Sequence, residues 1–433
     1  MDRNSLEAGP GRSSFCILPW MHLYACEEGI LRPCCIARVE SQVMNRDESG
    51  RPHVIYDPDR IDEAWNSEFM RKVRRQMLSG VEPPVCHLCY RDERLGIDSH
   101  RLVMNHRFDH LVDEALARTG EDGSSPAELI RSVDLRLGNL CNLRCRMCSP
   151  MFSKVLIAEW AEMRSQPADE GRLGELSRLD WFDRPEVWEM LERHVPRMER
   201  LHFAGGEPLI SRRMVEFLER IVAAGAAGRI DLSYNTNLTV LQPRIVDLWR
   251  RFRSVEAIVS LDGFGEVNSL IRAPSRWDVL ERNIRWIDSE PDLVIEPGMN
   301  VTVQVLNVFR LHELIGWVAT ELERFEPPHL SILTYPRHFG IQILPRELKE
   351  RAAARLHDFV REFEGRWPRR WAGEKLEQLL GSISGVVEHM MKADHSDALP
   401  EFRRWTLAQD ENRDQRAVDV LPELSSILPG TSP

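Results

Sequence analysis

Short apolar runs alternate with longer stretches of helical periodicity from about Leu129 onward. Six of these runs have the length and composition of strands, at residues 132–139, 200–206, 229–237, 255–263, 299–307 and 329–335. Between them, residues 212–224 and 244–252 repeat apolar side chains at the spacing of an amphipathic helix. Strands that alternate with helices pair in parallel. Six such units are fewer than the eight of a closed barrel, so they predict a partial, open (β/α)6 barrel.

The chain on either side of this pattern has a different character. Six of the nine cysteines lie between residues 16 and 93, ahead of a charged helical stretch at 92–117. Residues 118–128 are rich in Gly, Ser and acidic side chains, which is typical of a linker. After about Pro345 the pattern is mostly helical. We therefore expect three parts, namely an N-terminal cysteine-rich domain at 1–125, the barrel at 126–345 and a helical extension at 346–433.

Composition narrows the class of protein. The 433 residues are 42% hydrophobic and 29% charged, as in globular proteins of two or three domains. The net charge of −11 argues against nucleic acid as a partner, because phosphate binding favours a basic surface. No apolar run reaches about 18 residues, and the N-terminus lacks the apolar core of a secretory signal. We expect a cytoplasmic protein without a membrane span, whose clustered cysteines bind metal or perform redox chemistry.

The predicted strands end in Gly, Asn, Asp or another polar residue. In β/α barrels the carboxyl ends of the strands build the active site. Gly, Asn and Asp also end strands as ordinary turn residues, which explains any single strand end equally well. Several such ends with a specific composition favour a bound cofactor.

Three cysteines follow the first predicted strand in the segment GNLCNLRCRMCSP, residues 138–150. Their spacing, Cys141-x3-Cys145-x2-Cys148, supplies three thiolates to a cubane and leaves the fourth iron open, whereas iron–sulfur clusters normally take four cysteines. A zinc ribbon would need two Cys-x2-Cys pairs. Cys86 and Cys89 form a second such pair, but zinc shared between the pairs would leave Cys141 unused.

This triplet and the segment FAGGEPL (203–209) resemble the radical S-adenosylmethionine (SAM) superfamily. The resemblance implies that the open iron chelates the amino and carboxylate groups of SAM. Reductive cleavage then gives methionine and a 5′-deoxyadenosyl radical, which abstracts a hydrogen atom from the substrate. Gly205, Gly206 and Glu207 are implied to hold the amino group of SAM. Glycine permits a close backbone approach, and a carboxylate pairs with an ammonium.

The later strand ends carry further implied SAM contacts. The third ends in Thr236 and Asn237, where Leu238 replaces the family's usual glycine. The fourth is followed by a segment whose implied contacts are Ser260, Asp262 and Arg272. Met147, just before the third cysteine, stands where the family often places an aromatic residue against adenine. Two asparagines near the fifth strand serve equally well as turn residues or as ligands, namely Asn300 and Asn307.

The N-terminal cysteines resemble an auxiliary-cluster domain of the same superfamily, called SPASM or, in its shorter form, twitch. The spacing is Cys16-x12-Gly-x4-Cys34, followed by Cys86-x2-Cys89. Four thiolates would fully coordinate one [4Fe–4S] cluster for electron transfer, and a structural zinc is the alternative. Cys35 competes with Cys34 as a ligand. Segments elsewhere in the chain add to the resemblance, namely 62–80, Asp410, Arg413 and 422–424.

The resemblance implies a radical SAM enzyme that activates C–H bonds in an oxidoreductase-like reaction. The auxiliary cluster would handle the electron of the substrate radical, and flavodoxin or ferredoxin would donate electrons. The expected substrate is a ribosomal peptide, and the alternatives are a small molecule (a sugar, nucleotide or secondary metabolite) or a non-catalytic metal scaffold. Candidates for a second catalytic group, each equally explained by packing or a turn, are His202, Tyr234, Tyr335 and His338.

Overall fold

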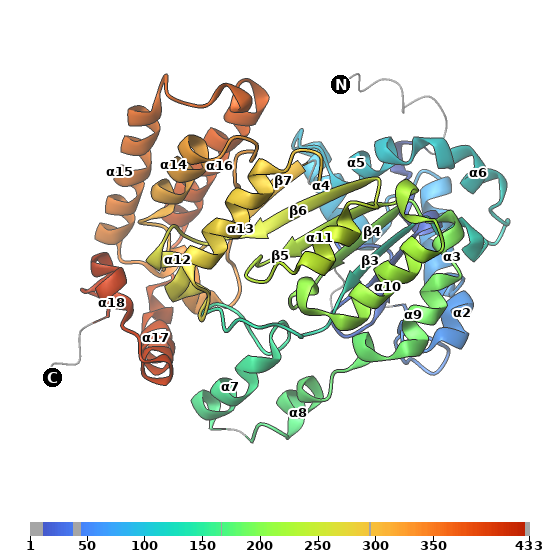
Figure 1. Ribbon diagram of the computed structural model, residues 1–433, viewed down its shortest axis with the longest axis horizontal. Coiled ribbons are helices and arrows are strands. Elements are labelled where there is room, and N and C mark those ends of the chain that lie inside the picture. The colour runs from blue at the N-terminus through green and yellow to red at the C-terminus, as the bar shows by residue number, and fades with distance from the viewer. Residues whose placement is uncertain (1–11, 38–44, 166, 294–295, 429–433) are drawn as a thin grey trace.

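One mixed sheet organises the computed structural model, which describes residues 12–37, 45–165, 167–293 and 296–428. Its strands run in the order β2-β1-β3-β4-β5-β6-β7-β8 (Figure 1). Only β2 is antiparallel to its neighbour, and all other pairs are parallel. The strands are β1 (His22–Ala25), β2 (Leu31–Arg32), β3 (Ser132–Arg136), β4 (Arg200–Ala204), β5 (Asp231–Thr236), β6 (Ser254–Ser260), β7 (Glu296–Val303) and β8 (His329–Ile332).

The six predicted strands correspond to β3 through β8, and β7 begins three residues earlier than expected. The parallel pairing follows from the helices that intervene between consecutive strands, because a helical crossover returns the chain to the same end of the sheet. The α/β class with a parallel sheet is therefore confirmed. The partial (β/α)6 barrel stays a prediction.

The two faces of the sheet differ in chemistry. Alternate residues such as Leu135, Phe203 and Val259 belong to the main hydrophobic core, and we call their side the apolar face. Helices α9 (Pro185–Glu192), α10 (Arg212–Ala223), α11 (Pro243–Trp249) and α13 (Trp277–Ser289) add their apolar side chains to the same core (Figure 1). The intervening residues, among them Asp134 and His202, lie on the opposite side, which we call the polar face.

The N-terminal segment joins the sheet, which the sequence pattern did not reveal. Strand β1 pairs in parallel with β3, from His22 opposite Ser132 to Ala25 opposite Leu135. The charged stretch predicted as one helical region contains three short helices. The N-terminal helices are α1 (Leu18–Met21), α2 (Ile61–Trp65), α3 (Glu68–Leu78), α4 (His87–Arg94), α5 (His100–Arg107) and α6 (Val112–Ala117). The three-domain division stays a prediction, although β1 shares the sheet and the main core with β3.

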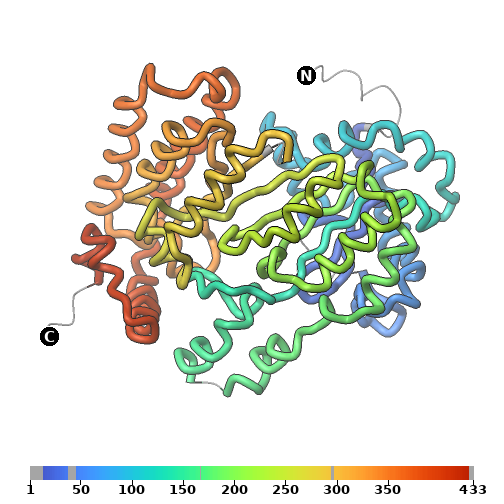
Figure 2. Tube along the Cα trace, in the orientation of Figure 1, coloured from blue at the N-terminus to red at the C-terminus, as the bar shows by residue number. Residues whose placement is uncertain are grey.

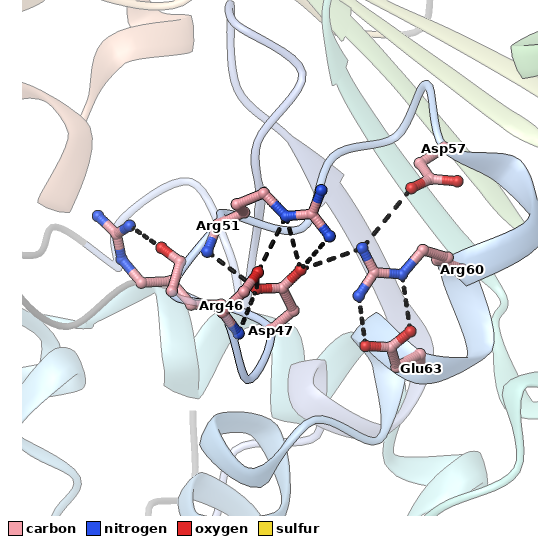
Figure 3. Close-up of polar contacts among 8 residues, drawn as sticks. Arg46, Asp47, Arg51, Asp57, Arg60 and Glu63 are labelled. Carbon is pink, nitrogen blue, oxygen red and sulfur yellow. Dashed lines mark hydrogen bonds and ion pairs between the residues drawn. The ribbon is translucent and has the colours of Figure 1, made fainter.

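A charged network fixes the loop that leads into α2 (Figure 3). Asp47 accepts hydrogen bonds from the side chain of Ser49 at 2.7 Å and from the guanidinium groups of Arg51 and Arg60, both at 3.1 Å. Arg60 also forms two hydrogen bonds with Glu63, at 2.7 and 2.6 Å. The hydrogen bond from Ser49, followed by those from the arginines, holds the pKa of Asp47 below its usual range.

The C-terminal helices gather at one end of the sheet (Figures 1 and 2). They are α14 (Leu311–Glu321), α15 (Arg346–Phe363), α16 (Glu374–Lys392), α17 (Leu399–Arg413) and α18 (Ala417–Val420). The remaining helices are α7 (Ile157–Arg164), α8 (Gly171–Ser177) and α12 (Glu266–Ile271). In the part of the chain that the structure describes, none of the helices has the length and apolarity needed to cross a membrane.

Candidate functional site

The loop after β3 brings Cys141, Cys145 and Cys148 together. The backbone N–H of Leu143 donates to the sulfur of Cys141 at 3.5 Å, and that of Cys148 donates to the carbonyl of Cys145 at 3.0 Å. Burial, with a smaller contribution from the neighbouring Cys145, raises the pKa of Cys141 to about 12. Burial also raises the pKa of Cys148, with contributions from both other thiols. The three sulfurs are therefore close enough to influence one another's ionisation.

These buried thiols ionise only if a cation offsets the cost of burial, and metal binding supplies that charge. No group of three His, Cys, Asp or Glu side chains within the described ranges is arranged around a single metal ion. A cubane differs from a single ion in this respect, because each of its protein thiolates binds a different iron.

Two glycines place the end of β4 directly against the cysteine loop. Gly205 and Gly206 have φ angles of +73° and +55°, a region that side chains rarely adopt. A Cβ atom on Gly206 would lie 2.2 Å from the carbonyl oxygen of Leu140, and one on Gly205 would lie 2.8 Å from the carbonyl carbon of Arg136. The N–H of Glu207 donates to the same Leu140 carbonyl at 2.7 Å. Glycine is thus required by both conformation and contact.

The Glu207 carboxylate is buried and held by three donors from the protein. One of its oxygens, Oε1, accepts from the N–H of Leu209 at 3.0 Å and from the hydroxyl of Thr236 at 2.6 Å. The other, Oε2, accepts from the N–H of Asn237 at 2.6 Å. Burial raises the pKa of Glu207 to about 7, although these hydrogen bonds oppose the rise. The carboxylate is therefore positioned at the ends of β4 and β5, where Arg272 acts on it electrostatically but none of the ion pairs found among the described residues includes it.

The end of β5 connects this carboxylate to the cysteine loop. The side-chain amide of Asn237 donates to Asn142 Oδ1 at 3.0 Å and lies 4.0 Å from the sulfur of Cys141. Leu238, which stands where a glycine was expected, has a φ of +51° and is fully buried. The backbone turns as a glycine would allow, and the buried leucine side chain helps to offset the strain of about 1 kcal/mol or more.

The end of β6 supplies an ion pair beside the thiols. Asp262 is fully buried and lies 2.8 Å from Arg272, measured between Oδ2 and Nε. Burial opposes the charge of Arg272, but Asp262, Cys145 and Cys148 raise its pKa above the usual value. Burial also raises the pKa of Cys145, and Arg272 opposes that rise. Arg272 is therefore a cation placed near two of the three thiols. Ser260, the last residue of β6, is half-buried.

Helix α17 holds the cysteine loop from the far end of the chain. Arg146, fully buried between two of the cysteines, donates to Asp410 at 2.5 Å. Gln409 donates to the carbonyl of Arg146 at 3.0 Å. Arg413 forms two hydrogen bonds with Glu159 of α7, at 3.0 and 2.6 Å, and both side chains are almost completely buried. Asp410 and Arg413 were noticed in the sequence only as part of a terminal pattern, and the pattern did not reveal these contacts.

The remaining predicted residues separate into different environments. Met147 is half-buried and packs against the main core. Asn307 caps a turn, because it accepts from the N–H of Gln304 and donates to the carbonyls of Asp262 and Thr302. The four candidates for a second catalytic group lie in four different environments. Tyr234 is buried on the apolar face, and Tyr335 is 75% exposed. His338 stacks on Trp405, and His202 alone of the four lies on the polar face.

The four N-terminal cysteines form a second neighbourhood. Burial raises the pKa of Cys34, and Cys35, Cys16 and Cys86 raise it further. Burial likewise raises the pKa of Cys86, to which Cys16 and Cys89 add. Cys16 and Cys34 belong to a smaller hydrophobic core, against which Cys86 packs. Electrostatic coupling thus links the four cysteines that the spacing had singled out.

Two side chains of α5 anchor this second neighbourhood, and the spacing of the cysteines gave no indication of them. Arg101 is buried, pairs with Glu93 and donates to the carbonyl of Phe15 at 2.7 Å. Asn105 donates to the same carbonyl at 2.8 Å and accepts from the N–H of Ile17, also at 2.8 Å. Together they fix the backbone on both sides of Cys16.

The arrangement defines an α/β protein with a parallel sheet, whose strand ends carry three cysteines, a glycine pair and a buried carboxylate. Residues 135–290 match the model of the Radical SAM superfamily, so the chain contains a radical SAM superfamily domain. That domain begins in β3 and includes both the cysteine loop and Glu207.

Several solved structures are similar to the chain at low sequence identity. SuiB of Streptococcus suis is 13% identical with a TM-score of 0.32, and the match covers 70% of this chain and 63% of SuiB. The structure of anSMEcpe with bound AdoMet is 12% identical with a TM-score of 0.35, covering 55% of this chain and 61% of that one. The structure of TYW1 with a lysine-pyruvate adduct bound is 13% identical with a TM-score of 0.28, and the match covers 65% of this chain and 89% of that one. No curated protein matches the chain.

Proposed function

We propose that the chain is a radical SAM enzyme that binds a [4Fe–4S] cluster through Cys141, Cys145 and Cys148 and binds SAM beside it. When bound, the cluster supplies the electron that splits SAM into methionine and a 5′-deoxyadenosyl radical, which abstracts a substrate hydrogen atom. The donor set fits, because three mutually interacting thiols occupy one loop and a fourth thiol is absent from it. Arg272 offsets part of the negative charge that three thiolates would bring.

The observation that carries this proposal is the acceptor capacity left on Glu207. A carboxylate offers about four lone-pair positions, and protein donors use two on Oε1 and one on Oε2. One position on Oε2 remains for a donor from outside the chain. A buried carboxylate with a raised pKa gains most from a cation, which the ammonium of SAM provides. Asn237 and Thr236 then orient the carboxylate for that contact.

The test is the formation of 5′-deoxyadenosine by the cluster-loaded protein with dithionite, without oxygen. We expect product in the wild-type protein and a change in the electron paramagnetic resonance spectrum when SAM is added, because the open iron gains ligands. Failure of a fully loaded protein on both measurements would instead support a non-catalytic metal scaffold.

For the N-terminal site, we propose an auxiliary [4Fe–4S] cluster on Cys16, Cys34, Cys86 and Cys89. Mutual electrostatic influence among these thiols and their shared apolar core support a closed site, in which all four cluster irons have protein ligands. Metal analysis decides between this cluster and a structural zinc, since two clusters require about eight iron atoms per chain. The role proposed for the cluster is to accept or return the electron of the substrate radical, with flavodoxin or ferredoxin as external donor.

The substrate that we propose is a ribosomal peptide, on the resemblance to auxiliary-cluster radical SAM proteins. Two similar structures contain bound peptides, SuiB its precursor peptide SuiA and anSMEcpe the Cp18Cys peptide. A small molecule is the alternative substrate. The reducing cytoplasm is the compartment we propose, since it keeps free thiols available for clusters.

A further inference from the structure

The polar face of the sheet carries chemistry that neither proposed cluster uses. Its side chains come from alternate positions of β1, β3 and β4, namely His22, Ser132, Asp134, Arg136, Arg200 and His202. Hydrogen bonds join neighbouring strands across it: His22 lies 2.9 Å from the hydroxyl of Ser132, and His202 lies 2.7 Å from that of Ser233. A buried surface this polar requires partners for its donors and acceptors.

Arg200 is a buried cation on this face with an unsatisfied hydrogen-bond donor. It is only 9% exposed, and its Nη2 donates to the hydroxyl of Ser233 at 3.0 Å. Its Nε is buried without a hydrogen-bond partner, and no carboxylate within the described ranges forms an ion pair with it. Burial, reinforced by Arg107, lowers the pKa of Arg200, and Asp134 opposes that change. Burying a guanidinium without a bound anion is costly, so this position favours an anionic ligand.

The charges around Arg200 indicate which anion fits. The carboxylate of Asp134 lies 3.2 Å from Arg136, so these two charges offset each other and Arg200 is left in surplus. Glu256 also acts on Arg200, though more weakly than Asp134. Burial lowers the pKa of His100 to about 4 and the pKa of His202 well below its usual value, so these imidazoles are neutral. One surplus positive charge matches a carboxylate better than a doubly charged phosphate.

The thiol of Cys35 can be labelled chemically and so reports on the charge of this face. Its thiol is half-buried, and burial raises its pKa, with Asp134 adding to the rise and Arg136 and Arg200 opposing it. The adjacent Cys34 is influenced by Cys35 and also by Cys16 and Cys86. Cys35 therefore lies beside Cys34 and is also within electrostatic reach of Arg200.

We propose that the polar face around Arg200 binds a carboxylate of the substrate, with His22, His202 and Ser233 as hydrogen-bonding neighbours. This rests on the proposed function only in naming the bound molecule as a substrate. Arg200 is the first residue of β4 and Gly205 follows the last, so at about 3.3 Å per residue the two lie about 16 Å apart. The carboxylate site is thus distinct from the SAM site at the other end of the same strand.

The test compares how fast the thiol of Cys35 reacts with a reagent that carries a carboxylate and with the corresponding neutral amide. The cluster-loaded protein is treated anaerobically with iodoacetate or iodoacetamide, and mass spectrometry measures the labelling rate of Cys35. The thiolate attacks both reagents and displaces iodide, so the ratio of their rates does not depend on the thiol's ionisation. We expect the ratio to exceed that of free glutathione by about fivefold, because Arg200 attracts the carboxylate. Arg200→Met should bring the ratio to the glutathione value, whereas Arg197→Met, an exposed arginine nearby, should not.

A protection experiment identifies the source of the carboxylate. N-acetylglycine should slow the iodoacetate reaction, and N-acetylglycinamide should not. Protection by pentaglycine as well would indicate a peptide terminus, and protection by N-acetylglycine alone would indicate a small acid. A wild-type ratio equal to that of glutathione, a ratio unchanged by Arg200→Met, or no labelling of Cys35 by either reagent would overturn the proposal. None of these readouts needs SAM cleavage, so failure of the proposed function would be seen separately in the 5′-deoxyadenosine assay.

Discussion

The two cysteine neighbourhoods differ in what surrounds their sulfur atoms. The loop after β3 places three thiols among polar groups at strand ends, where Glu207 keeps an unused acceptor position and Arg272 provides a cation. The N-terminal neighbourhood places Cys16 and Cys34 in an apolar core with Cys86 packed against it, and the nearby Arg101 is already paired with Glu93. The first arrangement can accept a further polar ligand, whereas the charged side chain described beside the second, Arg101, is already paired.

In each neighbourhood, the number of thiols matches the polarity of the groups around them. Three thiols leave one iron of a cubane without a protein ligand, and an unfilled metal position is useful only where polar groups can hold the incoming molecule. Four thiols fill the shell, and an apolar environment then shields the cluster from water. Variants that remove one member of each neighbourhood test whether the two sites differ in this way.

Cys145→Ala should have the largest effect. Two thiols do not retain a cubane, so SAM cleavage should fall by at least about a thousandfold, to background. The measurement is 5′-deoxyadenosine formation by the reconstituted variant. Cys26→Ala is the matched control, because Cys26 is a buried cysteine outside both neighbourhoods and its loss should leave the rate within about twofold. Wild-type turnover in Cys145→Ala would refute the cluster assignment.

Cys86→Ala should separate the two neighbourhoods. We expect the iron content to fall by about half, and SAM cleavage to persist within about threefold of wild type while substrate modification stops. Iron analysis and the two activity assays check this outcome. Loss of SAM cleavage together with product would indicate that the N-terminal site is needed for folding, and the contrast between an open and a closed cluster would lose its support.

Arg413→Met should test how the cysteine loop is held. It leaves Glu159 buried without its main partner, which destabilises a protein by about 3–5 kcal/mol. Arg416→Met is the control, since Arg416 is 60% exposed and its 3.8 Å pair with Asp419 should contribute about 0.5 kcal/mol or less. Urea unfolding of both variants measures the difference. Equal stabilities would show that the Arg413–Glu159 pair does not hold α17 against α7.

Glu207→Gln should have the smallest effect, on SAM affinity. Loss of a charged hydrogen bond predicts about 10- to 100-fold weaker binding, measured by calorimetry. The pKa of about 7 in the SAM-free protein adds a pH dependence. As the pH falls from 8 to 6 the carboxylate becomes protonated and loses its attraction for ammonium, so wild-type binding should weaken by about tenfold. The dependence should vanish in Glu207→Gln and persist in the exposed control Glu186→Gln.

Much of the sheet and the cysteine loop could be predicted from the sequence, because their signals are local. Alternating apolar runs marked β3 through β8, and the triplet and glycine pair lie within short segments. Strand β1 was missed because four residues, HLYA, are too few to establish a period, and its parallel partner β3 lies more than one hundred residues away.

Other features of the site depend on tertiary contacts that no local pattern encodes. Arg146 and Asp410 are 264 residues apart, and Arg101 reaches Phe15 over 86 residues. Leu238 has a positive φ, which a glycine at this position would have indicated, so the leucine concealed the turn. The polar face was likewise hidden, since His202 and Arg200 lie in a short run that reads as an ordinary buried strand.

The long separation between Arg146 and Asp410 also bears on how the protein is made. A ribosome that adds about 5–20 residues per second needs about 15–50 s to synthesise the intervening 264 residues. Throughout that interval the nascent loop has emerged without the helix that later covers it. Machinery that delivers iron and sulfide therefore has access before release of the finished chain, and a chain truncated before Asp410 would leave the loop permanently uncovered.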